Sequence, residues 1–379
     1  MSDIREPFLL TPGPLTTSAR VKRAMLRDWG SRDEEFLHLS QKVRSGILKI
    51  AGAGERFAAV PLQGSGTYAV EAMIASFIAD DAGALVLVNG AYGRRIVEIA
   101  ERLGKRISAY EVADDSLHDL QEVERRLASD PDLRTAIVVH CETTSGLLNP
   151  LEEIAATVKR HGRGLLVDAM SSFGALPLDV EALDITALAA SSNKCLQGVP
   201  GLSFVLARRE ELEAAAGRGS SLVLDLCAQY RQLEVDGQYR FTPPTHVIAA
   251  LAEALDELTE EGGPPARYAR YKKNCELLIE GMRELGFKTA LADSLQAPII
   301  ASFREPEEDW FSFEIFYNAL KQRGFAIYAG KMKSASTFRI GTIGAIDPQT
   351  ITQFLQIVPL VIVEMKAGLL HQSQQMPSN

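Results

Sequence analysis

Two polar residues stand at the ends of apolar stretches, where a reactive group could be placed. Lys194 follows one such stretch within residues 190–195 (ASSNKC), and Asp168 ends another at residues 166–168 (LVD). A lysine among small and apolar residues can have a lowered pKa, which suits an amine that attacks a carbonyl. Taken singly, such a lysine is more often a solvated surface residue, and the aspartate is as often a helix cap.

A glycine-rich turn at residues 62–67 (LQGSGT) precedes a predicted helix. Backbone N–H groups and hydroxyls at such a helix start converge on an anion, so Ser65, Gly66 and Thr67 predict a phosphate site. The turn lacks the lysine of a P-loop and the third glycine of a dinucleotide fingerprint. By itself it also fits a non-enzymatic module that binds a phosphate ligand.

Together, these three features match the parts of a pyridoxal 5′-phosphate (PLP) site. The turn at residues 64–67 would hold the cofactor phosphate, and Asp168 would pair with the protonated pyridine nitrogen. Lys194 would carry the cofactor as a Schiff base and then act as the catalytic base. The combination is therefore more specific than any one of its members.

Two further segments follow predicted strands and could face the ring. Tyr92 lies in residues 89–93 (NGAYG) and could stack on the pyridine ring, although a core or surface aromatic explains it as well. Thr143 and Thr144 lie in residues 141–146 (CETTSG) and offer hydroxyls to a ring oxygen; the alternative is a capping turn.

Strand-length apolar runs alternate with helix-period segments over the first half of the chain. This alternation indicates an α/β fold with a mainly parallel sheet covered by helices on both faces. Leu202–Ala207 predicts a further strand, with an antiparallel direction as one option. The other expected strands are Ala84–Val88, Thr135–His140, Gly164–Val167 and Ile185–Ala190, and the expected helices are Val70–Ile78, Arg95–Leu103 and Leu151–His161.

The C-terminal part has a different rhythm. Thr245 is a predicted N-cap, a helical pattern runs to about Gly286, and residues 262–265 (GGPP) interrupt it. We predict a large PLP-binding domain at residues 1–263, including the N-terminal segment, and a small α+β domain at residues 264–379. Its expected strands are Phe287–Leu291, Pro298–Phe303 and Thr337–Gly341, and its expected helices are Phe311–Arg323 and Pro348–Met365.

Composition argues against several classes of partner. The net charge is −9 without a basic cluster, so we expect no nucleic acid. The four cysteines are far apart and form no CxxC pair, so we expect no metal site and a reducing, cytoplasmic location. Met1–Pro7 has no apolar core, and the apolar stretch Ile357–Met365 is too short to cross a bilayer, so no membrane partner is expected.

The motifs resemble those of the fold type I, class V aminotransferases, a family of PLP enzymes. Within it, the resemblance is to the group that uses 2-aminoethylphosphonate as amino donor and pyruvate as acceptor. It implies a mainly parallel, seven-stranded type of sheet and a small C-terminal domain. The matching stretches run through almost the whole chain: LLTPGPLTTS (9–18), VPLQGSGT (60–67), LVNGAYGRR (87–95), HCETTSGLLNPLEEIA (140–155), VDAMSSFGALPLD (167–179), NKCLQGVPG (193–201), YRFTPPTHV (239–247), LQAPII (295–300) and TFRIGTIG (337–344).

The resemblance also implies roles for the matched residues. Tyr239 and Thr242 match a pair that reaches the phosphate from the neighbouring subunit, which implies a homodimer with shared sites. Arg339 matches the arginine that binds the substrate's acidic group, with Gly13 and Arg32 on the same side. The cofactor set is Ser65, Gly66, Thr67, Tyr92, Thr143, Thr144, Asp168, Asn193 and Lys194.

The expected reaction converts 2-aminoethylphosphonate and pyruvate into phosphonoacetaldehyde and L-alanine, as a step of phosphonate degradation. Arg32 departs from the family pattern, which has an aromatic residue there, and a second cation for a phosphonate is one explanation. The alternatives are an alanine–glyoxylate or serine–glyoxylate type of aminotransferase and a PLP lyase or desulfurase. A non-enzymatic phosphate-binding module is the remaining option.

Overall fold

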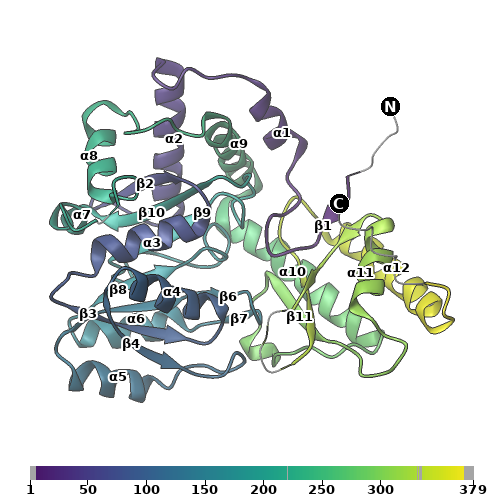
Figure 1. The fold of residues 1–379 in the computed structure, drawn as a ribbon. Helices are drawn as coiled ribbons and strands as arrows, with labels where there is room; N and C mark the ends of the chain where they lie inside the picture. The colour runs from purple at the N-terminus through teal and green to yellow at the C-terminus, as the bar shows by residue number, and fades with distance from the viewer. Residues whose placement is uncertain (1–5, 220, 331, 333–334, 371–379) are drawn as a thin grey trace, which may run out of the picture.

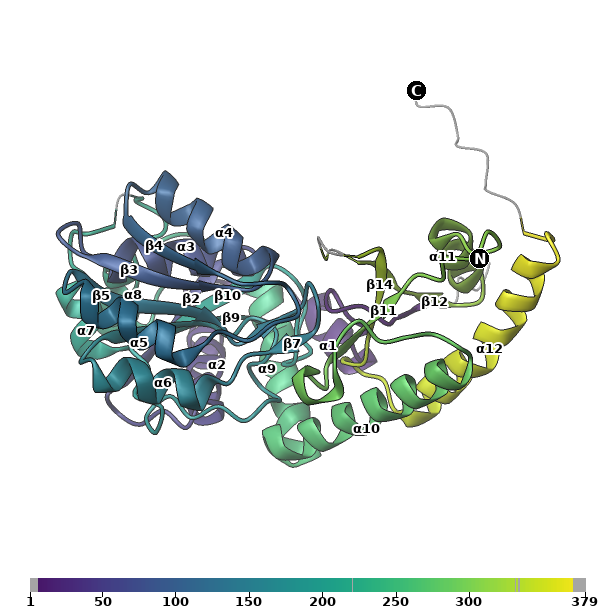
Figure 2. The ribbon, with the colours of Figure 1, turned by 90° about the horizontal axis from the view of Figure 1, so that it is seen from below.

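The computed structural model describes residues 6–219, 221–330, 332 and 335–370, which form a larger and a smaller region (Figures 1 and 2). The strands are β1 Phe8–Leu9, β2 Phe57–Gln63, β3 Gly83–Val88, β4 Arg106–Glu111, β5 Leu133–Val139, β6 Cys141–Glu142, β7 Leu147–Leu148, β8 Gly164–Asp168, β9 Ala187–Ser191, β10 Leu202–Arg208, β11 Ile300–Arg304, β12 Phe325–Ala326, β13 Tyr328–Ala329 and β14 Thr337–Gly341. The α-helices are α1 Ala19–Arg23, α2 Glu34–Ile50, α3 Gly66–Phe77, α4 Ala91–Arg102, α5 Leu120–Ser129, α6 Leu151–Arg160, α7 Arg209–Ala214, α8 Leu226–Asp236, α9 Thr245–Glu261, α10 Gly263–Glu284, α11 Phe313–Gln322 and α12 Pro348–Lys366.

A seven-stranded sheet organises the larger region, in the order β2-β10-β9-β8-β5-β3-β4. β10 runs antiparallel to both of its neighbours, whereas β9, β8, β5, β3 and β4 pair in parallel. The expected α/β fold with a mainly parallel sheet is confirmed, as is the antiparallel option for Leu202–Ala207. Because the carboxyl ends of the parallel strands meet at one edge, that edge is where a site is expected.

Helices cover both faces of this sheet, and alternate residues of β9 show how the two layers divide. Leu188 and Ala190 belong to the core beneath α2, α5, α6 and α9. Ala187 and Ala189 belong to the core beneath α3, α4 and α8 on the opposite face. This period of two is that of a strand buried on both faces, which explains its continuous apolar sequence.

Two edge strands of the large sheet, β2 and β4, were not predicted from the sequence. β2 contains Pro61, which argues against a central strand but is tolerated here because β2 pairs only with β10. β4 lies at the opposite edge and carries Arg106 and Glu111 at its ends, so it has no long apolar run. The expected strand at Phe287–Leu291 is wrong: there, only Thr289 forms an isolated bridge.

The smaller region packs α10, α11 and α12 against a three-stranded sheet in the order β11-β14-β13. Its core is rich in phenylalanine, with Phe303 and Phe338 stacked at 5.6 Å between ring centroids. β1 pairs in parallel with β12, and Leu10 joins this core, so the N-terminal segment packs on the C-terminal region. The division at 263/264 falls at the start of α10 and stays a prediction.

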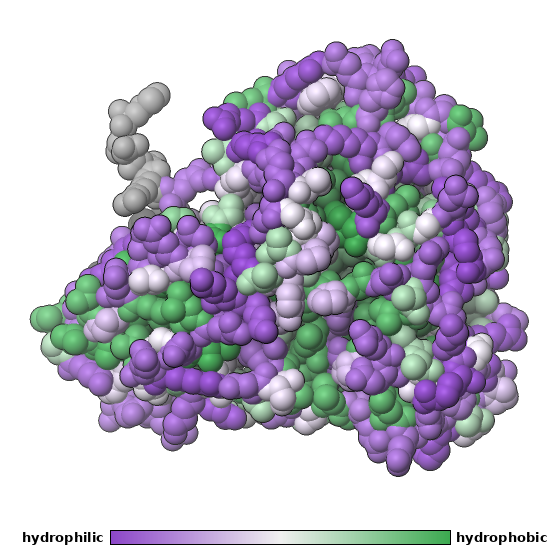
Figure 3. Space-filling view, turned by 180° about the vertical axis from the view of Figure 1, so that it is seen from behind, coloured by the Kyte–Doolittle hydropathy of each residue, from purple (hydrophilic) through white to green (hydrophobic). Residues whose placement is uncertain are grey.

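The described residues include no helix that is long and apolar enough to cross a membrane. They also include no group of three or more His, Cys, Asp or Glu side chains that could hold a metal ion. Seen from behind, hydrophilic residues cover most of the surface and hydrophobic residues appear in patches between them (Figure 3).

Candidate active site

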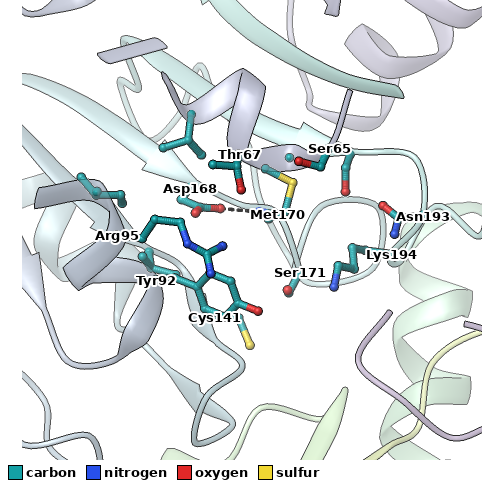
Figure 4. Close-up of a pocket in the computed structure, with 15 residues that line it drawn as sticks. Ser65, Thr67, Tyr92, Arg95, Cys141, Asp168, Met170, Ser171, Asn193 and Lys194 are labelled. Atoms are coloured by element: carbon teal, nitrogen blue, oxygen red, sulfur yellow. Dashed lines mark hydrogen bonds between the residues drawn. The ribbon is translucent and has the colours of Figure 1, made fainter. Parts of the chain in front are cut away.

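A cavity of about 200 Å³ opens at the carboxyl edge of the large sheet (Figure 4). It brings together most of the cofactor residues expected from sequence, from segments far apart in the chain. Its lining consists of Ser65, Gly66, Thr67, Val70, Tyr92, Arg95, Ile96, Val139, Cys141, Asp168, Met170, Ser171, Ser191, Asn193 and Lys194.

Lys194 lies in the turn that follows β9, and its amine is directed at the N-terminal segment. Its Nζ donates to the carbonyl oxygen of Pro12 at 2.8 Å. Gly13 packs against this lysine with φ +119°, a backbone conformation that L side chains rarely adopt, so this position favours glycine. Burial lowers the pKa of Lys194 to about 8, and the charge of Arg339 adds to this effect. A neutral, nucleophilic amine is therefore accessible near physiological pH.

The turn that carries Lys194 is fixed from the smaller region. The N–H of Gln197 donates to Lys194 O at 2.8 Å, with Gln197 in a left-handed conformation. Nη1 of Arg267 on α10 donates to the carbonyls of Cys195 and Leu196 at 3.0 and 3.3 Å. These bonds hold the lysine backbone in place independently of what its amine contacts.

Asp168 is the last residue of β8 and is 5% exposed. One carboxylate oxygen, Oδ1, accepts the Met170 N–H at 2.9 Å, as the dashed line in Figure 4 shows. Burial raises the pKa of Asp168 to about 6, against the opposing effects of this hydrogen bond and of the charges on Lys194 and Arg95. An ionised carboxylate that is buried in this way favours a cationic partner, because the opposite charge offsets the cost of removing it from water.

The N-terminus of α3 forms the next part of the wall. Ser65 is the N-cap, but its side chain makes no capping hydrogen bond, so the hydroxyl is not used by the helix. Gly64 has φ +135°, which favours glycine, and a Cβ on Gly66 would lie 2.2 Å from Met170 Sδ, so the Met170 side chain would have to shift to admit one. Free N–H groups and a helix dipole at this point suit an anion.

Tyr92 lies in the first turn of α4 and is anchored by a buried carboxylate. Glu142 Oε2 accepts the N–H groups of Tyr92 and Gly93 at 3.1 and 3.3 Å. Thr144 donates to Glu142 and accepts the Ala91 N–H at 3.2 Å, so its hydroxyl serves this anchor. The Arg95 guanidinium lies 5.0 Å from the centroid of the Tyr92 ring.

Arg339, on β14, lies between the two regions and is 3% exposed. Its Nε donates to Ala329 O at 3.0 Å, and its Nη1 donates to Thr143 O at 2.9 Å. Burial lowers the pKa of Arg339, which nevertheless stays charged. Within the described part of the chain, its recorded hydrogen bonds go to carbonyls rather than to a carboxylate, so the positive charge is left for a ligand.

Seven residues expected at the site are absent from the cavity lining. Gly13, Thr143, Thr144 and Arg339 make the contacts given above, and the other three are Tyr239, Thr242 and Arg32. Tyr239 accepts a hydrogen bond from Ser40 Oγ at 3.2 Å, Thr242 is exposed, and both lie outside the lining. Arg32 is exposed in the turn before α2 and is also outside the lining. Their contribution from a neighbouring subunit stays a prediction.

The protein-family comparison matches the model described as aminotransferase class-V over residues 17–343. The chain belongs to the class-V aminotransferases. The expectation from the motifs is thereby confirmed, and the non-enzymatic module is excluded, because the match covers most of the chain and includes every lining residue of the cavity.

Relatives of this aminotransferase agree over nearly the full chain. It is 48% identical to a 2-aminoethylphosphonate–pyruvate transaminase from Pseudomonas fluorescens, over 95% of this chain and 98% of the relative. It is 48% identical to one from Pseudomonas aeruginosa, over 96% and 98% of the two chains. Among solved structures, pyridoxamine–pyruvate aminotransferase from Mesorhizobium loti superposes with a TM-score of 0.87 at 26% identity, covering 97% of this chain and 94% of the other.

Several lining residues of this aminotransferase escaped sequence analysis. Met170 and Ser171 follow Asp168 directly, and Cys141 precedes the Glu142 anchor. Ser191 ends β9, and Arg95 lies one helical turn after Tyr92. The sequence did carry a signal for two of these residues. Arg95 follows Tyr92 by three positions on a helix and Ser191 follows Ala189 by two on a strand, and both spacings place side chains on one face.

Proposed function

We propose that this aminotransferase uses PLP to transfer the amino group of 2-aminoethylphosphonate to pyruvate, giving phosphonoacetaldehyde and L-alanine. The observation that carries the chemistry is the cavity in which a buried lysine amine, a buried aspartate and an uncapped helix start converge. The substrate assignment is supported by the two relatives of 48% identity that carry this activity in their names.

The residues of the cavity fit PLP as its cofactor. The α3 start, with the unused Ser65 hydroxyl and the close approach allowed by Gly66, suits the phosphate. Asp168, whose burial calls for a cationic partner, suits the protonated pyridine nitrogen. When bound, PLP supplies a carbonyl that condenses with amines and a ring that accepts electron density from the adjacent carbon.

Each residue then has a defined task. Asp168 would keep a proton on the pyridine nitrogen, and Tyr92, at the start of α4, would contact the ring. Lys194 Nζ, with its pKa lowered to about 8, is neutral often enough to take a proton from the carbon that bears the substrate nitrogen. The same amine would later return a proton. Without a substrate, it contacts the carbonyl of Pro12 and the backbone of Gly13.

Arg339 is the proposed anchor for the acidic group of both substrates. Its burial strengthens the attraction to a phosphonate or carboxylate, and its fork of donors matches both anions. Since pyruvate and 2-aminoethylphosphonate are both anions, one cation can serve both halves of the reaction.

We also propose a homodimer in which Tyr239 and Thr242 reach the partner's phosphate site. Phe241, between them, is 48% exposed, and Leu222 is 70% exposed. The two loops are joined, because Arg240 Nη1 donates to Leu222 O at 2.9 Å. Exposed apolar side chains beside the predicted contact pair support a protein interface at this surface.

A donor and acceptor panel tests the proposed reaction. Purified protein is incubated with 2-aminoethylphosphonate, alanine or serine as donor and with pyruvate or glyoxylate as acceptor, and the amino acid product is quantified. We expect alanine formation from 2-aminoethylphosphonate and pyruvate to have the highest kcat/KM. Transfer from alanine or serine to glyoxylate, without reaction of 2-aminoethylphosphonate, would contradict the substrate assignment.

A further inference from the structure

Gln197 has a backbone conformation that glycine would adopt more easily. Its φ is +64°, and among the described residues it is one of only two residues other than glycine with a positive φ. The left-handed region is unfavourable for a residue with a Cβ, so a glutamine at such a position indicates that its side chain contributes something else. That side chain is 3% exposed and is not part of the cavity lining. Its contacts within the protein therefore indicate its role.

The side-chain amide of Gln197 crosses from the larger region to the smaller one. Its Nε2 donates to the carbonyl oxygen of Gly344 at 2.8 Å and also to the hydroxyl of Tyr271 on α10. The same hydroxyl accepts the N–H of Gly344 at 3.2 Å, so the three residues form a closed set of hydrogen bonds. Gln197 follows Lys194 by three positions, and its own N–H donates to Lys194 O at 2.8 Å. The turn that carries Lys194 is thereby tied to Gly344.

Gly344 lies in the segment that follows β14, the strand that carries Arg339. Its carbonyl oxygen also accepts a hydrogen bond from Arg270 Nη1 of α10 at 2.8 Å. The N–H of the next residue, Ala345, donates to Thr16 O at 2.8 Å, in the N-terminal segment that also contacts the lysine amine. This one point of the backbone therefore joins the Lys194 turn, the N-terminal segment, α10 and the strand of Arg339.

We propose that Gln197 is a positioning residue that fixes the distance between the Lys194 amine and the Arg339 guanidinium. This rests on the proposed function, in which the amine moves a proton of a substrate whose acidic group Arg339 holds. Because the two groups come from different regions, a rotation of one region on the other would change their separation. The buried bonds from Gln197 to Gly344 and Tyr271 oppose such a rotation, since breaking them would leave polar groups unpaired.

The charge on Arg339 provides a measure of this distance that needs no turnover. Burial lowers the pKa of Lys194 to about 8, and the charge of Arg339 contributes to this shift. The neighbours that act in the opposite direction are Cys195, Asp168 and Cys141. Arg339→Gln removes a positive charge, so it should raise the pKa of Lys194. This rise becomes smaller as the two groups are held further apart.

The test measures the pKa of Lys194 in the full-length protein after removal of the cofactor. The pKa is obtained from the pH dependence of the rate at which acetic anhydride acetylates Lys194, quantified by mass spectrometry. The rise caused by Arg339→Gln is compared in wild type, in Gln197→Met and in Asn274→Leu. Both background substitutions replace a buried amide by an apolar side chain of similar size. Asn274 is the matched control, because it donates to two carbonyls of the segment after β14, at 3.2 and 3.4 Å, but has no recorded hydrogen bond to the Lys194 turn within the described chain.

We expect the rise in the pKa of Lys194 to be equal in the wild-type and Asn274→Leu backgrounds and to fall to about half or less in Gln197→Met. With the cofactor bound, Gln197→Met should lower kcat for 2-aminoethylphosphonate about tenfold at little change in KM, because the substrate still binds but the amine is misplaced. Asn274→Leu should change kcat by less than about twofold.

Tyr271→Phe is a second variant that keeps the ring and loses only the hydroxyl shared by Gln197 and Gly344. It should reduce the rise less than Gln197→Met does, because the bond from Gln197 to Gly344 remains. If Gln197→Met does not fold, the Tyr271→Phe background decides the question in the same way.

Two outcomes overturn the proposal, and they differ from failure of the proposed function. An undiminished rise in the Gln197→Met and Tyr271→Phe backgrounds would show that Gln197 does not set the distance. An equal reduction in Asn274→Leu would assign the effect to packing between the regions in general. A wild-type protein that does not transfer the amino group of 2-aminoethylphosphonate would contradict the proposed function, whereas the response of the Lys194 pKa would still decide the role of Gln197.

Discussion

The proposed cofactor side and substrate side of the active site differ in how they are held. Asp168 and the α3 start lie at the carboxyl edge of the large sheet, supported by backbone groups of the same region. Arg339 comes from β14 of the smaller sheet, and its two hydrogen bonds span both regions, to Ala329 and to Thr143. Asp168 and the α3 start are therefore held within the larger region, whereas Arg339 depends on how the two regions meet. Changes on the first side should affect every substrate, and changes on the second should affect recognition of acidic groups.

The largest expected effect is on the cofactor side, at Lys194. Lys194→Ala should lower kcat by at least about 10³-fold for every donor, because both the nucleophilic amine and the proton carrier are lost. It should also abolish covalent trapping of PLP by borohydride, measured by mass spectrometry. Lys159→Ala is the control, since Lys159 is 64% exposed in a surface ion pair with Asp184. Equal trapping in the Lys194 variant would assign the covalent role elsewhere.

Asp168→Asn should separate function from stability on the same side. Turnover should fall by roughly 10²-fold or more for all substrates, because an amide does not hold the proton on the pyridine nitrogen. At pH 8 the cofactor-free variant should nevertheless be more stable than the cofactor-free wild type, by on the order of 1–3 kcal/mol. Burial raises the pKa of Asp168 to about 6, so folding the wild type buries an unfavourable charge that the asparagine lacks.

The sign of the pH dependence follows from that raised pKa. Well below about pH 4, Asp168 is protonated in both the folded and the unfolded state, so wild type and variant should unfold at similar denaturant concentrations. Between about pH 4 and 6 the carboxyl is ionised in the unfolded state but still protonated in the folded state, so the wild type loses stability relative to the variant, and the loss is complete once the folded state ionises above about pH 6. Urea unfolding of both apoproteins from pH 4 to 8 measures this, and a constant difference would contradict it.

Arg339→Gln tests the substrate side. The kcat/KM for 2-aminoethylphosphonate and for pyruvate should each fall about 10²-fold, since a buried charge-assisted pair with the substrate is lost. The Kd for PLP, measured by absorbance titration, should stay within a few-fold. A large loss of PLP affinity would erase the distinction between the two sides.

The smallest effect is expected at Arg32, which is exposed and lies outside the cavity lining. Arg32→Trp should change kcat/KM for either substrate by less than about twofold, as surface substitutions commonly do. Steady-state kinetics of both half-reactions provide the measurement. A tenfold selective change for 2-aminoethylphosphonate would instead make Arg32 part of the substrate side, supplied across the proposed dimer.

Sequence alone predicted the parts of this enzyme that follow simple periodicities. β8 and β9 were found because strands buried on both faces are continuously apolar, and Asp168 and Lys194 were found because they end those runs. β2 was missed because Pro61 is compatible only with an edge, and edges are a property of the whole sheet. Glu142, fully buried, was missed because its role is to accept the N–H groups of Tyr92 and Gly93. These residues are distant in the sequence, so the contact exists only in the folded chain. The homodimer and the cytoplasmic location stay predictions.

The pairing of β1 with β12 has a consequence for the order in which the chain is made. The segment that includes Phe8 emerges from the ribosome among the first residues, but its partner Phe325 is added late in synthesis. The same segment places Pro12 and Gly13 against Lys194. A nascent chain can therefore form the large sheet while Lys194 still lacks its cover. The β1–β12 pairing forms only once residues 325 and 326 have been added, so the segment that contacts Lys194 is anchored to the smaller region late in synthesis.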